Sequence, residues 1–290
     1  MRWFDQLLAF LDDADSSSVP ARIRAFEIIL VVLSVTELWL HGLELGQIAG
    51  PISWALRIFG LSCGAAACTP AWRRPGFLLL ALGMVFAIWD SFPSTGNHLY
   101  LECFLCAVCA LLDPSQNEER RLLTRSVRWV SCVILFYAGV QKLVHGYYTS
   151  GLMPAFLLQE PRFERIFSLL LPASEAQRIR SYNGLDGAGP YLVSAPLWLL
   201  ASNLVWILEI GLAAALFVAR TRCAALFVGI VFVALIEIGA REILFGLLFV
   251  NLLLMFLSTD ANRRFVPIVA ITCAIAILVQ LGWLPAVEMH

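Results

Sequence analysis

Lysine is almost absent from this sequence. Lys142 is the single lysine among 20 basic side chains, and arginine supplies all the others. Charge of any kind is scarce, at 14% of the 290 residues against roughly 25% in a soluble domain. This excludes an ordinary soluble protein. The net charge of −1 and the lack of a long basic run give no reason to expect a nucleic-acid partner.

Hydrophobic residues are abundant instead, at 60% with a mean hydropathy of +0.81. They fall in blocks of about 18 to 25 residues, the length that crosses a hydrocarbon core about 30 Å thick. We therefore predict an all-α, polytopic transmembrane helical bundle of about nine spans, or eight if the turn at 239–242 does not divide the run around it. The predicted spans lie near residues 25–45, 53–70, 75–92, 97–113, 127–145, 195–219, 222–239, 242–258 and 265–285.

Two segments fall outside these spans. Residues 1–24 have an apolar patch too short for a signal peptide, followed by aspartates, and are predicted to lie on the membrane as an amphipathic segment. Residues 25–290 then form the transmembrane domain. Its long segment 146–194 is rich in Pro, Gly and polar residues and is either a lid over an outward-facing cavity or an interfacial connector. Short amphipathic stretches are expected there, around 152–170 and 174–182.

Arginines alternate along the short connections. They occur in the connections after the second, fourth, sixth and eighth spans, whereas those at 46–52 and 93–96 hold none. Because Lys and Arg gather on the cytoplasmic side, this predicts a cytoplasmic N-terminus. We expect a multi-pass protein of the plasma (inner) membrane with its active face extracytoplasmic.

The eight cysteines all lie in or at the ends of apolar runs. The spacing of Cys103, Cys106 and Cys109 allows a metal site to be considered, but three-residue steps turn the sulfurs about 60° apart on a helix, and no other ligand cluster completes a shell. We expect small buried hydrophobic residues and predict no metal.

Ionisable residues inside predicted spans are costly, so each is a candidate for function. Most of them lie in the outer half of their span, which predicts a polar cavity that opens outward. The alternative is interfacial ion pairing without chemistry. The supporting polar residues of this predicted site are Glu37, His41, Arg57, Glu102, His145, Glu237 and Arg241.

Lys142 is the most informative of the ionisable residues. Arginine stays protonated, whereas a desolvated lysine can lose its proton near neutral pH and act as a base. Ala138 and Gly139 lie one turn below it and allow a helix or a flat ligand to approach closely. The pattern predicts Lys142 as a catalytic base.

Two stretches, "GNHLYLECFLCAVCALLDPS" (96–115) and "VSCVILFYAGVQKLVHGYYTSG" (130–151), resemble the horizontally transferred transmembrane (HTTM) family, which includes the vitamin K-dependent gamma-glutamyl carboxylase. The matching elements are Asn97-His98-x-Tyr100 and Tyr137-x-Gly139-x-x-Lys142. The resemblance implies that Lys142 deprotonates a quinol, with His98 in the same active site. It also implies that the quinol cofactor is bound by Asn97, Tyr100, Tyr137 and Gly139, and we expect Gln141, where the carboxylase has a second lysine, to contribute to the same site.

Two functions follow from this pattern. The first is a quinol-dependent, carboxylase-like enzyme, a lyase or oxidoreductase, in which Lys142 is the base and His98 shares the proton while Glu102 holds its ring. The second is a non-catalytic membrane module for maturation, export or immunity of a secreted peptide, in which Lys142 stays charged and pairs with Glu37, Glu102 or Glu237. A transporter is less favoured because no pair of broken spans occurs. The expected partners are membrane lipids, a quinone and a secreted peptide or protein substrate.

Overall fold

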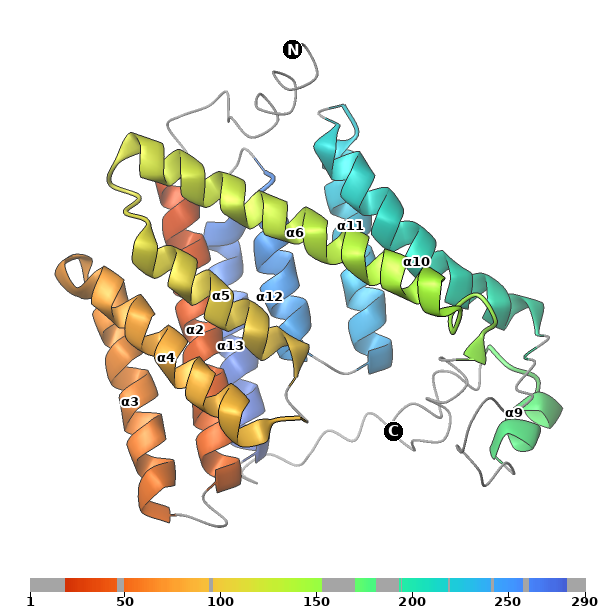
Figure 1. The fold of residues 1–290 in the computed structure, drawn as a ribbon, viewed down its shortest axis with the longest axis horizontal. Coiled ribbons are helices and arrows are strands. Elements are labelled where there is room, and N and C mark those ends of the chain that lie inside the picture. The colour runs from red at the N-terminus through yellow and green to blue at the C-terminus, as the bar shows by residue number, and fades with distance from the viewer. Residues whose placement is uncertain are drawn as a thin grey trace. The chain divides into compact units, whose positions relative to one another are not determined.

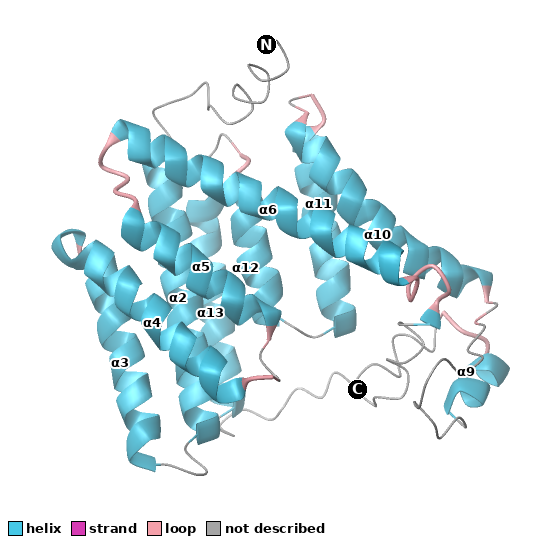
Figure 2. Ribbon diagram, viewed as in Figure 1, coloured by secondary structure: helices cyan, strands magenta, loops and turns pink. Residues whose placement is uncertain are grey.

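The computed structural model describes residues 19–45, 50–93, 96–152, 170–180, 193, 195–218, 220–240, 243–257 and 261–280. These residues form helices joined by short loops, and no strand occurs among them (Figures 1 and 2). The prediction of an all-α protein is confirmed. Residues 1–18 of the predicted amphipathic segment lie outside the described residues.

The chain divides into two compact units. The first contains the described residues up to Trp129 and those from Ile243 onward. Its helices are α2 (Val19–Leu45), α3 (Gly50–Cys68), the 3₁₀ turn η1 (Pro70–Trp72), α4 (Arg73–Ser91), α5 (Asn97–Leu111), the first part of α6 (Asn117–His145), α12 (Ile243–Leu254) and α13 (Ala261–Gln280). The second unit, from Val130 to residue 240, contains the rest of α6, α9 (Ala173–Arg180), α10 (Pro196–Phe217) and α11 (Arg222–Ala240).

Each of the nine predicted spans overlaps one of these helices. The helix α2 begins at Val19, before the predicted start at residue 25, since Pro20 in a first turn has no N–H to satisfy and a φ suited to a helix. The break predicted near 239–242 lies between the end of α11 at Ala240 and the start of α12 at Ile243. Arg241 and Glu242 are outside the described residues.

Among the described residues, four helices are long and apolar enough to cross a membrane: Gly50–Cys68, Pro70–Ser91, Asn117–His145 and Pro196–Phe217. This identifies a membrane protein. Two of the predicted spans are shorter than expected: α5 has 15 residues and α12 has 12, or about 22 Å and 18 Å at 1.5 Å per residue. Both are shorter than a hydrocarbon core of about 30 Å.

The helix α2 is the centre of the first unit, packed against α3, α4, α5, α12 and α13. It carries Glu27, Ser34 and Glu37, all of them buried. Polar side chains are tolerated on this helix because the neighbouring helices surround it and supply hydrogen-bond and ion-pair partners for these side chains. By contrast, α3 and α4 expose large side chains on their outward faces, including Trp54 and Trp89 near their ends, and Trp72 of η1 is exposed as well.

Arginines gather at one end of the first unit. At this arginine end α2, α4 and α6 begin, and α3, α5 and α12 end. The last carbonyls of a helix have no partner within it, and arginines from the helices that begin here supply the donors. Arg24 donates to the carbonyl of Cys68 at the end of α3, and Arg22 to that of Leu257 just after α12.

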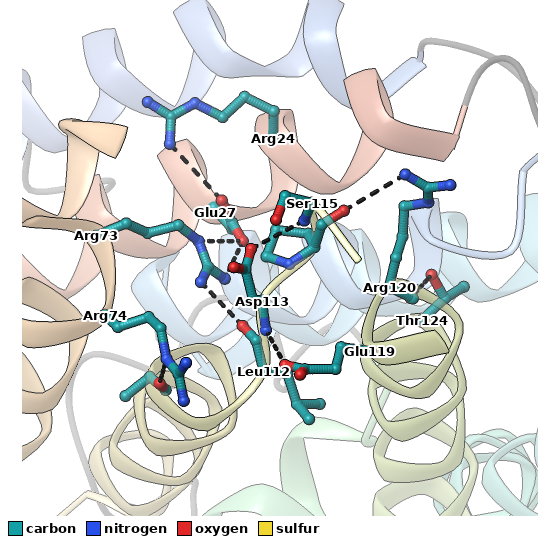
Figure 3. A network of polar contacts seen from close by, with 12 residues as sticks. Arg24, Glu27, Arg73, Arg74, Leu112, Asp113, Ser115, Glu119, Arg120 and Thr124 are labelled. Carbon is teal, nitrogen blue, oxygen red and sulfur yellow. Dashed lines mark hydrogen bonds and ion pairs between the residues drawn. The ribbon is translucent and has the colours of Figure 1, made fainter. Parts of the chain in front are cut away.

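Glu27 and Arg73 form a buried ion pair at the arginine end (Figure 3). Arg73 Nε lies 3.0 Å from Glu27 Oε1, and Arg73 Nη1 donates to the carbonyl of Leu112 at 2.9 Å. Arg24 approaches the other oxygen of Glu27, at 3.6 Å. In the loop between α5 and α6, the backbone and side chain of Ser115 lower the pKa of Asp113 by hydrogen bonding to its carboxylate.

The helix α6 has charges suited to its dipole. Glu118 and Glu119 lie in its first turn, and Lys142 and His145 in its last. The acidic side chains lie at the positive, N-terminal end of the helix macrodipole and the basic side chains at its negative, C-terminal end, and both arrangements are stabilising. The helix ends at His145 because the next residue, Gly146, adopts a positive φ of 71° that terminates helices and that glycine adopts without strain.

Candidate functional site

Lys142 forms an ion pair with Glu209. Its Nζ lies 2.7 Å from Glu209 Oε1, and the contact joins the last turn of α6 to the middle of α10 within the second unit. The Glu209 side chain is 7% exposed and that of Lys142 is 22% exposed. An ammonium and a carboxylate at this distance make a charge-assisted hydrogen bond.

A close approach of the two helices makes this pair possible. A Cβ added to Gly139 would lie 2.6 Å from Ile210 Cγ1, 3.0 Å from the carbonyl oxygen of Trp206 and 3.1 Å from Glu209 Cβ. A side chain at position 139 would therefore push α10 away. Gly139 was predicted to allow a helix or a ligand to approach closely beneath the lysine. In the structure, α10 is the element that approaches there.

The turn after α6 covers the lysine. The ring of Tyr148 lies with its centre 5.4 Å from Lys142 Nζ, within the range of a cation–π contact. Burial, and then the negative charge of Glu209, raise the pKa of Tyr148 to about 12. Its hydroxyl therefore keeps its proton at physiological pH.

This turn is fastened to the start of α10. Ser202 donates a hydrogen bond to the carbonyl of Tyr148, and Trp198 Nε1 donates to the carbonyl of Gly151 at 2.9 Å. Trp198 also belongs to a small core with Leu171, Ala176, Val193 and Ala195, which includes a residue of α9. The helix α9 covers most of the second amphipathic stretch predicted in the 146–194 segment, and residues 153–169 of the first lie outside the described residues.

One oxygen of the Glu209 carboxylate is unused. Oε2 is buried and has no hydrogen-bond partner among the described residues. A carboxylate accepts up to about four hydrogen bonds, and a buried oxygen without a donor is unfavourable. The pair therefore has capacity for one more donor.

His98 lies in the first unit with a different carboxylate. Its Nε2 is 3.0 Å from Glu37 Oε1, between α5 and α2. One turn away, Ser34 donates a hydrogen bond to Glu102 Oε2 at 2.9 Å. The expectation that Glu102 holds the imidazole is corrected: Glu37 lies against the ring because it is one turn above Ser34 on α2, as His98 is one turn above Glu102 on α5.

The partners predicted for Lys142 also need correction. Glu37, Glu102 and Glu237 were the expected carboxylates, and Glu209 is the one in contact. Glu37 and Glu102 belong to the first unit, where His98 and Ser34 engage them. Glu237 is half-buried on α11. Lys142 and His98, predicted to share a site, each have a carboxylate of their own unit.

Other predicted site residues are distributed as follows. His41 Nε2 lies 3.3 Å from Asp90 Oδ2, and Arg57 is buried beside two tryptophans. His145 is exposed and stacks on Tyr147 with ring centres 6.0 Å apart. Tyr100, Tyr137 and Gln141 are exposed. Asn97 is the first residue of α5, and its side chain is outside the described part of the structure.

The cysteines agree only in part with the expectation of buried hydrophobic residues. All eight lie within the described residues, and none of them is in a disulfide bond. Five are buried, Cys68 and Cys103 are half-buried, and Cys223 is exposed near the start of α11. Cys106 lies 3.5 Å from Ser34 Oγ, beside Glu102. No group of three or more potential ligands that could hold a metal ion occurs among the described residues.

Sequence reasoning did not include Glu209, Tyr148 or Ser34 in the site. Glu209 had a usable signal, since it is an ionisable residue in the middle of a predicted span and such a residue requires a partner. Tyr148 and Ser34 had none, because neither a tyrosine after a helix nor a serine within one is unusual.

Comparisons of the chain with family models, with curated proteins and with solved structures found no match.

Proposed function

We propose that this chain is a multi-pass protein of the plasma (inner) membrane in which Lys142 removes a proton from a lipid-soluble quinol. The observation that carries the proposal is the 2.7 Å contact between Lys142 Nζ and Glu209 Oε1, with the second Glu209 oxygen buried and without a donor among the described residues. A spare acceptor beside an amine is suited to a phenolic hydroxyl, which donates one hydrogen bond.

The pair supplies a route for the proton. In a poorly solvated site the ion pair converts to a neutral amine and a carboxylic acid when the proton moves from Nζ to Oε1. The amine would then accept the proton of a quinol hydroxyl, and the ammonium that forms on Lys142 would compensate the negative charge of the quinol oxygen. Charge is conserved, because one ammonium and one oxyanion form from two neutral groups.

The surroundings suit a ligand that arrives from lipid. Phe136, Tyr137, Leu143 and Val144 on α6 are exposed, so the surface next to Lys142 is apolar and partly aromatic. Tyr148, still protonated, is a hydroxyl donor and a flat ring close to the lysine. The resemblance of residues 96–115 and 130–151 to the HTTM family supports the same chemistry. The roles that it implies for His98 and for the other predicted quinol-binding residues stay predictions.

The topology is part of the proposal. We propose nine spans with the arginine end of the first unit on the cytoplasmic side, which puts the N-terminus inside and the residues after α6 on the extracytoplasmic side. The contacts of Arg22, Arg24 and Arg73 support this, because they join helices that begin at that end to helices that end there. In this topology, the short helices α5 and α12 cross the membrane together with the loop residues next to them.

A single lysine makes the test direct. Selective ¹⁵N labelling of the lysine side chain in the purified chain should give one signal, and we expect that signal to change when a quinol analogue is added. Lys142→Arg can keep the pair with Glu209 but cannot release its proton, so proton uptake from the analogue should fall by about 100-fold or more. Wild-type proton uptake in Lys142→Arg would contradict the proposal.

One observation favours the non-catalytic alternative. The contact with Glu209 compensates the charge of Lys142 and ties α6 to α10, as a purely structural ion pair would. In that case the lysine signal is that of an ammonium both with and without the quinol analogue. Lys142→Arg would then leave the function of the protein intact, with the segment after α6 as a docking surface for a secreted peptide.

A further inference from the structure

A buried arginine without a counter-ion lies at the end of the first unit opposite the arginine end. Arg57, on the second turn of α3, is 7% exposed. Its Nη2 donates to Ser53 Oγ at 2.5 Å and its Nε to the Ser53 carbonyl at 3.3 Å. No carboxylate of the described residues lies within ion-pair distance of it. A buried charge without compensation is strongly unfavourable.

Other buried arginines of this unit are engaged by carbonyls or a carboxylate. Arg22 donates to the carbonyl of Leu257 and Arg128 to that of Met255, both just beyond the end of α12. Arg73 pairs with Glu27. Arg57 reaches only a serine of its own helix, so three of its five N–H groups remain without an acceptor in the described structure.

Two tryptophans flank this guanidinium. Its central carbon is 4.0 Å from the ring centre of Trp54 and 5.4 Å from that of Trp39. Trp39 Nε1 is also buried and has no acceptor among the described residues. Both α2, through Trp39, and α3, through Arg57, therefore supply N–H donors that have no acceptor in the described structure. An anion bound between them would provide acceptors for these donors.

The guanidinium is held in place. Ser53 Oγ, which accepts from Arg57, donates in turn to the carbonyl of Gly42 at 2.5 Å. A Cβ on Gly42 would lie 2.8 Å from Arg57 Cγ, so the arginine stem packs directly on the backbone of α2. A donor set that is fixed in advance loses little entropy when it binds a ligand.

We propose that Arg57, with Trp39 and Trp54, binds the phosphate of a phospholipid headgroup. The guanidinium fork matches two phosphate oxygens. A lipid source is favoured because Trp54, which flanks the guanidinium, is exposed, and exposed Ile58 and Leu61 continue on the same face of α3 as a surface for acyl chains. Tryptophan is also typical of the headgroup level of membranes. Free phosphate has the same oxyanion chemistry and is the competing source.

The test uses the purified full chain, delipidated in a neutral maltoside detergent. Native mass spectrometry measures binding of short-chain phosphatidylglycerol, and inorganic phosphate is added as a competitor. We expect Arg57→Gln to weaken phosphatidylglycerol binding by at least about tenfold, since it removes a charge-assisted, two-pronged contact. The matched control Arg121→Gln, at an exposed arginine paired only with exposed Glu118, should stay within about twofold.

Two further variants keep the test decisive if Arg57→Gln does not fold. Arg57→Lys retains the charge but not the fork, and Trp39→Phe retains the ring but not the N–H, so each should weaken binding by about three- to tenfold. Equal binding by the wild type and all Arg57 and Trp39 variants would overturn the site. Displacement of the lipid by millimolar inorganic phosphate would overturn the lipid assignment in favour of a free anion.

Discussion

Glu27 is the buried carboxylate around which the arginine end is arranged. Arg73 hydrogen-bonds it from α4, and Arg24 approaches it from the preceding turn of α2. The same Arg73 side chain donates to a carbonyl at the end of α5, and Arg74 donates to two more, those of Ala110 and Leu111. Lysine has a single nitrogen and cannot bridge partners that lie apart. This is a physical reason for arginine at these positions. Lys142, by contrast, pairs with a single carboxylate, that of Glu209, in the described part of the chain.

We expect Glu27→Ala to lower the free energy of unfolding by about 3–5 kcal/mol, because it leaves Arg73 as an uncompensated buried charge. The measurement is thermal or denaturant unfolding of the purified chain in detergent. The control Glu118→Ala removes an exposed carboxylate, 88% accessible and 3.6 Å from Arg121, and should change stability by less than about 0.5 kcal/mol. Equal effects of the two variants would show that the buried network contributes no more to stability than an exposed ion pair does.

At the scale of elements, the contact of α6 with α10 depends on one glycine. Gly139→Ala should destabilise the protein by about 1–3 kcal/mol, because the new Cβ meets a side chain at 2.6 Å and a backbone oxygen at 3.0 Å. Separation of the helices should also lengthen the Lys142–Glu209 contact and weaken the binding of a quinol analogue.

The matched control for this prediction is Gly211→Ala on α10. A Cβ there meets nothing within 4 Å, and alanine favours a helix over glycine by up to about 1 kcal/mol. Its stability should therefore stay the same or rise. If Gly139→Ala behaves as Gly211→Ala does, the close approach of the two helices is not a determinant of stability.

At the scale of the whole molecule, the alternating helices predict which connections face the cytoplasm. With Cys223, the exposed cysteine, replaced by serine, Ser115→Cys tests the α5–α6 loop and Thr149→Cys the turn after α6. We expect a membrane-impermeant maleimide to label Thr149→Cys on intact cells and Ser115→Cys only after permeabilisation. The opposite labelling pattern would invert the proposed orientation. Labelling of both cysteines from the same side would show that α6 does not cross the membrane.

The fold was predictable to the level of helices, because the length of apolar runs and the Arg-rich breaks between them are local properties. The same reasoning located the break between α11 and α12. It failed on the extent of α5 and α12, since helix ends depend on the loops and caps they meet. Lys142, Gly139 and His98 were singled out by their rarity or motif, but the contacts of Lys142 with Glu209 and of His98 with Glu37 were not predicted.

What the sequence by itself determined is an all-helical membrane protein with few charges, whose basic side chains are all arginine except for one lysine near the end of an apolar helix. Each of these follows from composition and periodicity, which reflect the cost of exposing backbone and charge to lipid. Only the tertiary structure decided which charge meets which. It paired Lys142 with Glu209 and His98 with Glu37, and it left Arg57 between two tryptophans. Which side chains form ion pairs depends on how helices that are distant in sequence are rotated and how closely they approach. The pattern of apolar residues does not specify either property.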